Sequence, residues 1–249
     1  MYRQGASDDA PAANRLGVGF LLIWTLCTAI SLAIDRWDFT VHADVSTQEL
    51  TYWTAYAFAY RPLNGFCLAF LLVVLKRLVL RQPRLPTAPG HWYLLSMAVL
   101  LAIVRTEDVL RLAASAQADD WLGGFSNYSL PMSVATGLAT IAAFAGAIWI
   151  REHVWWRLTL ISLALDWMLA IAFAWDSNLV QSLVPSGLRL DTVGILLHSM
   201  PVAVSLAAMI HDRRSGRRHD FYHWLGIFTL WATTVVSWPS HFWYAAIYG

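Results

Sequence analysis

The sequence predicts an all-α, polytopic membrane helix bundle with about seven transmembrane helices, its N-terminus in the cytoplasm and its C-terminus outside. Three observations support this fold class. Of the 249 residues, 58% are hydrophobic and only 13% are charged, whereas soluble domains carry about 25% charged residues. Long apolar stretches recur along the chain, and the arginines gather in alternate loops. No polar block is large enough for a second domain, so we expect a polar tail over 1–15 and one membrane domain over 16–249.

Each predicted span has the roughly 20 apolar residues that a helix needs to cross the bilayer. The spans are 16–34, 52–75, 92–112, 129–150, 155–175, 190–210 and 224–246. The alternating pattern of a membrane β-barrel strand is absent from the sequence. Ser31-Leu32-Ala33 resembles a signal-peptide cleavage site, but its apolar stretch is long enough to span, so we expect the first helix to be retained.

The orientation follows from the loops. Basic clusters lie at Lys76–Arg84 and Arg213–Arg218, whereas acidic residues such as Asp35, Asp119 and Asp176 are expected in the opposite loops. Because cytoplasmic loops are enriched in arginine and lysine, the basic side is the inner side. Tryptophans at both ends of the predicted helices fit the two interfaces of the bilayer. We therefore expect a multi-pass protein of the cell (inner or plasma) membrane.

Several classes of protein are excluded by composition. The only lysine, Lys76, lies at an inner helix end, so the chain lacks the last-helix lysine that a retinal Schiff base needs. Cys27 and Cys67 both lie in apolar stretches and are expected to be small core residues. The net charge of +1 gives no reason to expect a nucleic-acid partner. The lipid bilayer is the expected partner, with a small molecule or ion as a further candidate.

Small residues mark one face of the predicted helix over 129–150. Ala135, Ala139, Ala143 and Ala147 recur every four positions, and small faces let helices pack closely in lipid. This pattern predicts a helix at the centre of the bundle. The alternative interpretation is a contact surface for a homo-oligomer or hetero-oligomer.

Charged residues within the predicted helices form a cluster in the outer half of the membrane. Arg105, Glu107, Asp108 and Arg111 follow one another on the span over 92–112, and Arg61 reaches a similar depth. Unpaired charges at this depth are costly, so these side chains are expected to face the bundle interior. One interpretation is a binding site for an ion, proton or small anionic molecule. The other is a self-neutralising ion network that joins helices.

Two more ionisable residues lie deep in predicted spans. Asp166 falls near the bilayer midplane, and its candidate partners are Arg61, His198 and nearby hydroxyls. A proton relay and a structural hydrogen bond are both compatible with it. His198 lacks a second histidine at matching depth, so a b-type haem is not expected.

The remaining candidate site is a group of histidines at inner helix ends: His91, His153, His211, His219 and His223. Imidazoles with a carboxylate suit zinc. The pattern His219-Asp-Phe-Tyr-His223 resembles the HxxxH motif of the seven-helix membrane hydrolases that include adiponectin-receptor-like proteins and alkaline ceramidases. That resemblance implies zinc-dependent hydrolysis, but the serine and histidine that this family has near the inner end of its second helix are absent here. We therefore do not carry the activity over.

Three functions remain open at this stage. The first is a membrane-embedded transport or small-ligand site lined by Arg61, Arg105, Glu107, Asp108 and Asp166. The second is a zinc-dependent membrane enzyme built on the inner histidines. The third is a non-catalytic accessory subunit of a larger membrane complex.

Overall fold

The computed structural model describes residues 18–41, 47–80, 88–115, 129–150, 153–175, 190–217 and 219–248. These residues form seven α-helices and no strand. The helices are α1 (Val18–Val41), α2 (Thr47–Val79), α3 (Pro89–Ser115), α4 (Ser129–Trp149), α5 (Val154–Trp175), α7 (Leu190–Ser215) and α8 (Phe221–Tyr248). The fold class predicted from sequence is confirmed: the protein is a helical membrane bundle.

The apolar character of the helices sets how they meet the membrane. Five of them are long and apolar enough to cross a bilayer over their described residues, namely α1, α2, α4, α5 and α7. On α1, the exposed side chains of Leu22, Leu26 and Ile30 recur along one stripe. Large apolar side chains exposed at this spacing are those that would face lipid.

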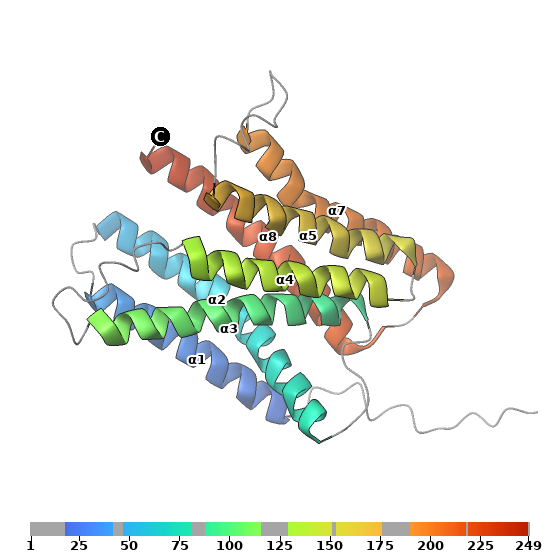
Figure 1. The fold of residues 1–249 in the computed structure, drawn as a ribbon, viewed down its shortest axis with the longest axis horizontal. Helices are drawn as coiled ribbons and strands as arrows, with labels where there is room; N and C mark the ends of the chain where they lie inside the picture. The colour runs from blue at the N-terminus through green and yellow to red at the C-terminus, as the bar shows by residue number, and fades with distance from the viewer. Residues whose placement is uncertain are drawn as a thin grey trace, which may run out of the picture.

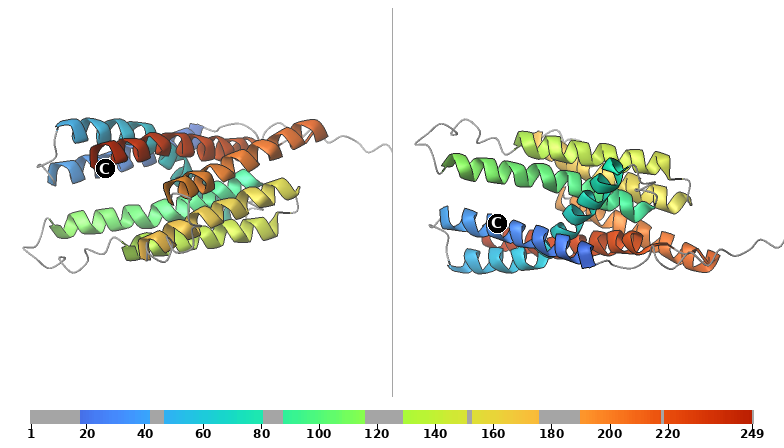
Figure 2. Two further views of the ribbon diagram at one scale, coloured as in Figure 1. Left: turned by 90° about the horizontal axis from the view of Figure 1, so that it is seen from above. Right: turned by 90° about the horizontal axis from the view of Figure 1, so that it is seen from below.

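The helices lie in two layers (Figures 1 and 2). Figure 2 shows α1 and α8 in one layer and α3, α4 and α5 in the other. The chain of α2 begins beside α1 and then bends toward the second layer. Pro62 lies inside α2, and a proline removes one backbone hydrogen bond and crowds the preceding turn. The bend therefore has a local cause in the sequence.

The central helix is α3, which corrects the prediction that the helix over 129–150 occupies the centre. Helix α3 packs against α1, α2, α4, α5 and α8, whereas α4 packs mainly against α3 and α5. The alanine face of α4 is buried inside the chain by these neighbours, with Ala135, Ala139 and Ala143 fully covered. In the described structure this alanine face therefore packs within the chain, and an oligomer contact through α4 stays a prediction.

The tightest crossing joins α3 to α8. A Cβ atom at Gly226 would lie 2.1 Å from the backbone oxygen of Gly90, and one at Gly90 would lie 2.0 Å from the backbone oxygen of His223. No side chain fits in that space, so glycine at both positions lets the two backbones touch. This crossing brings the first turns of α3 and α8 together and fixes where the histidines of both helices lie.

Candidate functional site

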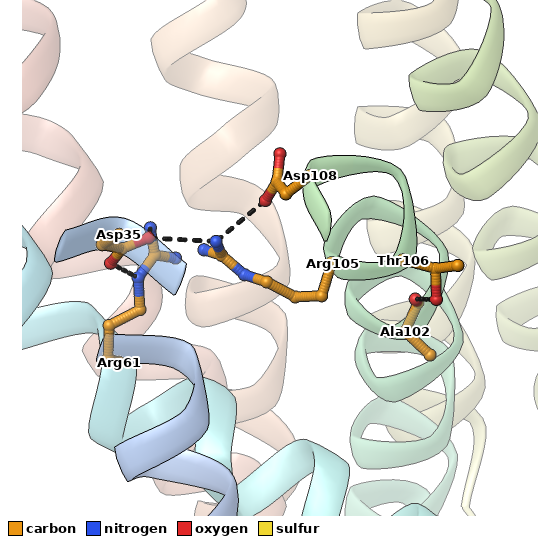
Figure 3. Close-up of polar contacts among 6 residues, drawn as sticks. All are labelled: Asp35, Arg61, Ala102, Arg105, Thr106 and Asp108. Carbon is orange, nitrogen blue, oxygen red and sulfur yellow. Dashed lines mark hydrogen bonds and ion pairs between the residues drawn. The ribbon is translucent and has the colours of Figure 1, made fainter. Parts of the chain in front are cut away.

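An ion network joins the outer halves of α1, α2 and α3 (Figure 3). Asp35 of α1 accepts hydrogen bonds from the Nε and Nη2 atoms of Arg61, the second at 2.8 Å. The Nη1 atom of Arg105 donates to Asp35 at 3.0 Å and to Asp108 at 2.8 Å. The four side chains are only 11–15% exposed. Charge-assisted bonds at such burial join three helices at one depth.

Asp35 is the residue that sequence reasoning misplaced. We expected it in an outer loop beyond a helix that ends at residue 34, but α1 continues to Val41. A carboxylate on the helix can satisfy two arginines from neighbouring helices, so the helix has no reason to end at its first charge. The signal available in the sequence was the excess of arginine over acid among the residues predicted at this depth.

Two more residues, Glu107 and Arg111, were predicted for the outer cluster. The side chain of Glu107 is half-buried on α3 and is engaged in an interaction. The side chain of Arg111 lies outside the described residues. Among the four residues of the network, two positive charges meet two negative charges. This balance is what an ion network that joins helices requires.

A cavity of about 70 Å³ lies between α2, α3, α5, α7 and α8. Within it, the Nδ1 atom of His198 lies 3.1 Å from a carboxylate oxygen of Asp166. His198 is therefore the partner that Asp166 finds among the candidates named from sequence. The cavity is lined by Tyr60, Tyr93, Met97, Leu163, Asp166, Trp167, His198, Pro201, Leu230, Thr233 and Thr234.

Depth along the helices places this pair well inside the membrane. Asp166 lies nine residues before the end of α5 and twelve after its start, which is about 14 Å and 18 Å at 1.5 Å per residue. His198 lies eight residues into α7, or about 12 Å. An ionisable pair at the middle of a bundle, beside a cavity with hydroxyl groups, is a candidate site for protons or ions.

A third group of polar side chains occupies the inner end of the bundle. The α7 helix ends at Gly216, which has a φ of +70°, and the Arg217 backbone N–H donates to the Asp212 carbonyl at 3.1 Å. This C-terminal cap turns the chain back. His219 then reaches the Asp212 carboxylate through its Nε2 atom at 2.7 Å. The Trp156 indole N–H donates to the same carboxylate oxygen at 2.5 Å.

Asp220 begins the last helix and joins it to α3. Its carboxylate accepts the backbone N–H of His223 at 2.8 Å, which is the bond of a helix N-cap. The same oxygen lies 2.8 Å from the Nε2 atom of His91. Burial raises the pKa of the Asp220 carboxyl, but hydrogen bonds from His91 and from the His223 backbone outweigh burial and hold the pKa below its ordinary value.

The predicted zinc site would need the ring nitrogens of the inner histidines, and several of these nitrogens are already hydrogen-bonded. Backbone N–H groups of Ala88 and Gly90 donate to the Nδ1 atoms of His91 and His223, at 3.3 and 3.1 Å. A neutral imidazole has one acceptor nitrogen, so neither ring keeps a lone pair for a metal while these bonds hold. The ring of His153 lies against that of His211, with centroids 3.6 Å apart and the planes tilted by 33°. Among the described residues, no three His, Cys, Asp or Glu side chains are placed to hold a metal ion.

Comparison with known proteins identifies no relative of this chain. Neither the protein-family models, nor the curated proteins, nor the solved structures contain a match to this chain. The function must therefore be inferred from the three polar groups: the outer ion network, the mid-depth cavity and the inner histidine group.

Proposed function

We propose that this protein is a membrane transport protein that carries protons, with the Asp166–His198 pair as its proton-binding site. The observation that supports the proposal is the cavity beside this pair at mid-depth. A carboxylate and an imidazole 3.1 Å apart can hold one proton between them, because the imidazole can donate and the carboxylate can accept. We place this activity in the cell membrane, where a proton gradient can act on it.

The size of the cavity favours a proton over a larger solute. Sites for drug-sized molecules occupy roughly 300–1,000 Å³, several times the 70 Å³ measured for this cavity. A water molecule needs about 10–15 Å³ of such space, so the cavity has room for a few waters. Waters beside hydroxyl groups and an ionisable pair are a medium through which a proton can move.

The polar surroundings also support this assignment. Tyr93 and Thr233 meet across the cavity wall with their hydroxyl oxygens 2.9 Å apart. The hydroxyl groups of Tyr60 and Thr234 belong to the same lining. Hydroxyl groups both donate and accept, so they can pass a proton along a chain of hydrogen bonds.

The outer ion network fits a supporting role in this proposal. Arg61 and Arg105 are both paired with Asp35, and their charges are balanced by Asp35 and Asp108. An anionic solute would have to compete with these carboxylates for the guanidinium groups. Sequence reasoning drew the transport site from Arg61, Arg105, Glu107, Asp108 and Asp166, and we now narrow it to Asp166 together with His198.

Flux measurements on the purified protein test the proposal. The chain is reconstituted in liposomes that hold a pH-sensitive dye, and a potassium gradient with valinomycin drives proton entry. We expect Asp166→Asn to lower the proton flux at least tenfold, while Asp166→Glu keeps a titratable carboxyl and retains most of it. His198→Gln should lower the flux as well. A wild-type flux equal to that of protein-free liposomes would reject the proposal.

A further inference from the structure

We infer that Asn64 holds ordered water between the outer ion network and the Asp166–His198 cavity, so that protons reach the cavity from outside. This inference rests on the proposed function and names the side from which the site is supplied. It begins with an unusual side chain. Asn64 is 1% exposed, and neither its Oδ1 nor its Nδ2 atom has a hydrogen-bond partner within the described part of the chain.

The position of Asn64 on α2 links the two polar groups. Residues three and four apart on a helix are neighbours on its surface. Asn64 follows Arg61 by three residues and Tyr60 by four. Arg61 belongs to the outer network, and Tyr60 lines the cavity. Asn64 thus lies one turn inward of Arg61, about 5 Å at 1.5 Å per residue, whereas Met97 of the cavity wall lies eight residues inward of Arg105, or about 12 Å.

Two other polar atoms of the neighbouring helices also lack partners among the described residues. They are the Nε atom of Arg105, whose guanidinium group belongs to the network, and the hydroxyl oxygen of Thr28. Thr28 lies beside Gly65, the residue after Asn64, because a Cβ atom on Gly65 would lie 2.1 Å from that hydroxyl oxygen. In addition, Pro62 has no N–H to donate to the carbonyl of the preceding turn.

Water accounts for this set of atoms better than any alternative. Buried polar groups are nearly always hydrogen-bonded, and bound waters bridge those that lack protein partners. The set contains donors, namely an amide and a guanidinium N–H, together with an amide acceptor and a hydroxyl group. Water satisfies both kinds, whereas an anion satisfies only donors and a metal ion only acceptors. The network, whose side chains remain 11–15% exposed, lies on the outward side of Asn64, so this is the side from which we infer that water enters.

The experiment replaces the amide with an apolar side chain of similar size. In the liposome assay, we expect Asn64→Leu to lower the proton flux at least tenfold without raising the Tm in detergent. Asn64→Ser keeps hydrogen-bonding capacity and should retain most of the flux. Thr140→Val is the matched control, since the Thr140 hydroxyl is already bonded to the Thr136 carbonyl on α4 and its loss should leave the flux unchanged.

Two outcomes would overturn the inference. If the Asn64→Leu protein conducts protons as well as the wild type, Asn64 is not on the path. If the Tm of Asn64→Leu rises above that of the wild type, no water was bound to the amide, since replacing an unsatisfied buried polar group by an apolar one stabilises a fold. Should the wild type itself carry no protons, the proposed function fails. The Tm comparison then still decides whether water occupies the junction.

Discussion

At the scale of single residues, Asp35 is the carboxylate of the outer network that bonds two guanidinium groups. It accepts hydrogen bonds from Arg61 and from Arg105, and thereby joins α1 to α2 and α3. Replacing it by asparagine would leave two buried guanidinium groups with one carboxylate. We expect Asp35→Asn to reduce the free energy of unfolding by about 3 kcal/mol, as for other broken buried ion pairs.

Thermal melting in detergent measures this effect. Asp35→Glu keeps the negative charge and should recover part of the lost stability. Equal Tm values for Asp35→Asn and the wild type would show that the network contributes nothing to holding the three helices together.

A second residue-scale prediction concerns Asp220 and pH. Its pKa is lower in the folded protein than its ordinary value. A carboxyl of this kind stabilises the fold above the pKa that it has when unfolded, and the contribution is lost as pH falls through the folded pKa. Asp220→Asn keeps an acceptor oxygen but removes the negative charge that strengthens two hydrogen bonds, so it should cost about 1–2 kcal/mol at neutral pH.

Chemical unfolding of the wild type and of Asp220→Asn, measured from neutral to acid pH, tests this prediction. The acid end of the range is the control. The difference between Asp220→Asn and the wild type should be full at neutral pH and should disappear in acid, once the wild-type carboxyl is protonated. A difference that stays constant with pH would mean that the charge of Asp220 does not matter.

At the scale of helices, the backbone contact between α3 and α8 gives the sharpest prediction. A methyl group at Gly226 would lie 2.1 Å from the Gly90 carbonyl oxygen, and a backbone atom cannot turn aside as a side chain can. We expect Gly226→Ala to destabilise the fold by about 3 kcal/mol, the upper part of the usual range for overpacking. Gly137→Ala on α4 is the matched control, because a Cβ atom there has open space.

The control should keep or raise the Tm, since alanine favours helix over glycine. If Gly226→Ala melts at the wild-type temperature, the two helices are not in contact as described. Loss of the inner histidine contacts should accompany the destabilisation, because the same crossing positions His91 and His223.

Sequence reasoning predicted the seven described helices well but not their arrangement. Apolar stretches fix where helices run, because a spanning helix must hide its backbone from lipid. The central position of α3 could not be found this way, since α3 is surrounded by protein and therefore tolerates Arg105 and Asp108. Similarly, Asp166 and His198 were identified as candidates because ionisable residues are rare deep in a span. Asn64 was missed because its amide is uncharged, so the same rule did not select it.

At the scale of the whole molecule, the remaining prediction is the orientation of the bundle in the membrane. The residues at the end of α7 include exposed Arg213, Arg214 and Arg217, and loops rich in arginine stay in the cytoplasm. The loop between α3 and α4 must then lie outside, because one helix separates each loop from the next. In this orientation the ion network lies in the outer half of the bundle and the histidine group at its inner end.

Cysteine labelling in intact cells tests it. Cys27 and Cys67 are buried and can be replaced by alanine to give a background without thiols. A membrane-impermeant maleimide should then modify a cysteine at Asp119, which lies between α3 and α4, but not one at Ser215, at the end of α7. Both sites should react once the membrane is permeabilised, which shows that each thiol is accessible. The reverse labelling pattern would mean that the bundle has the opposite orientation in the membrane. Protons would then reach the Asp166–His198 cavity past Asn64 from the cytoplasm.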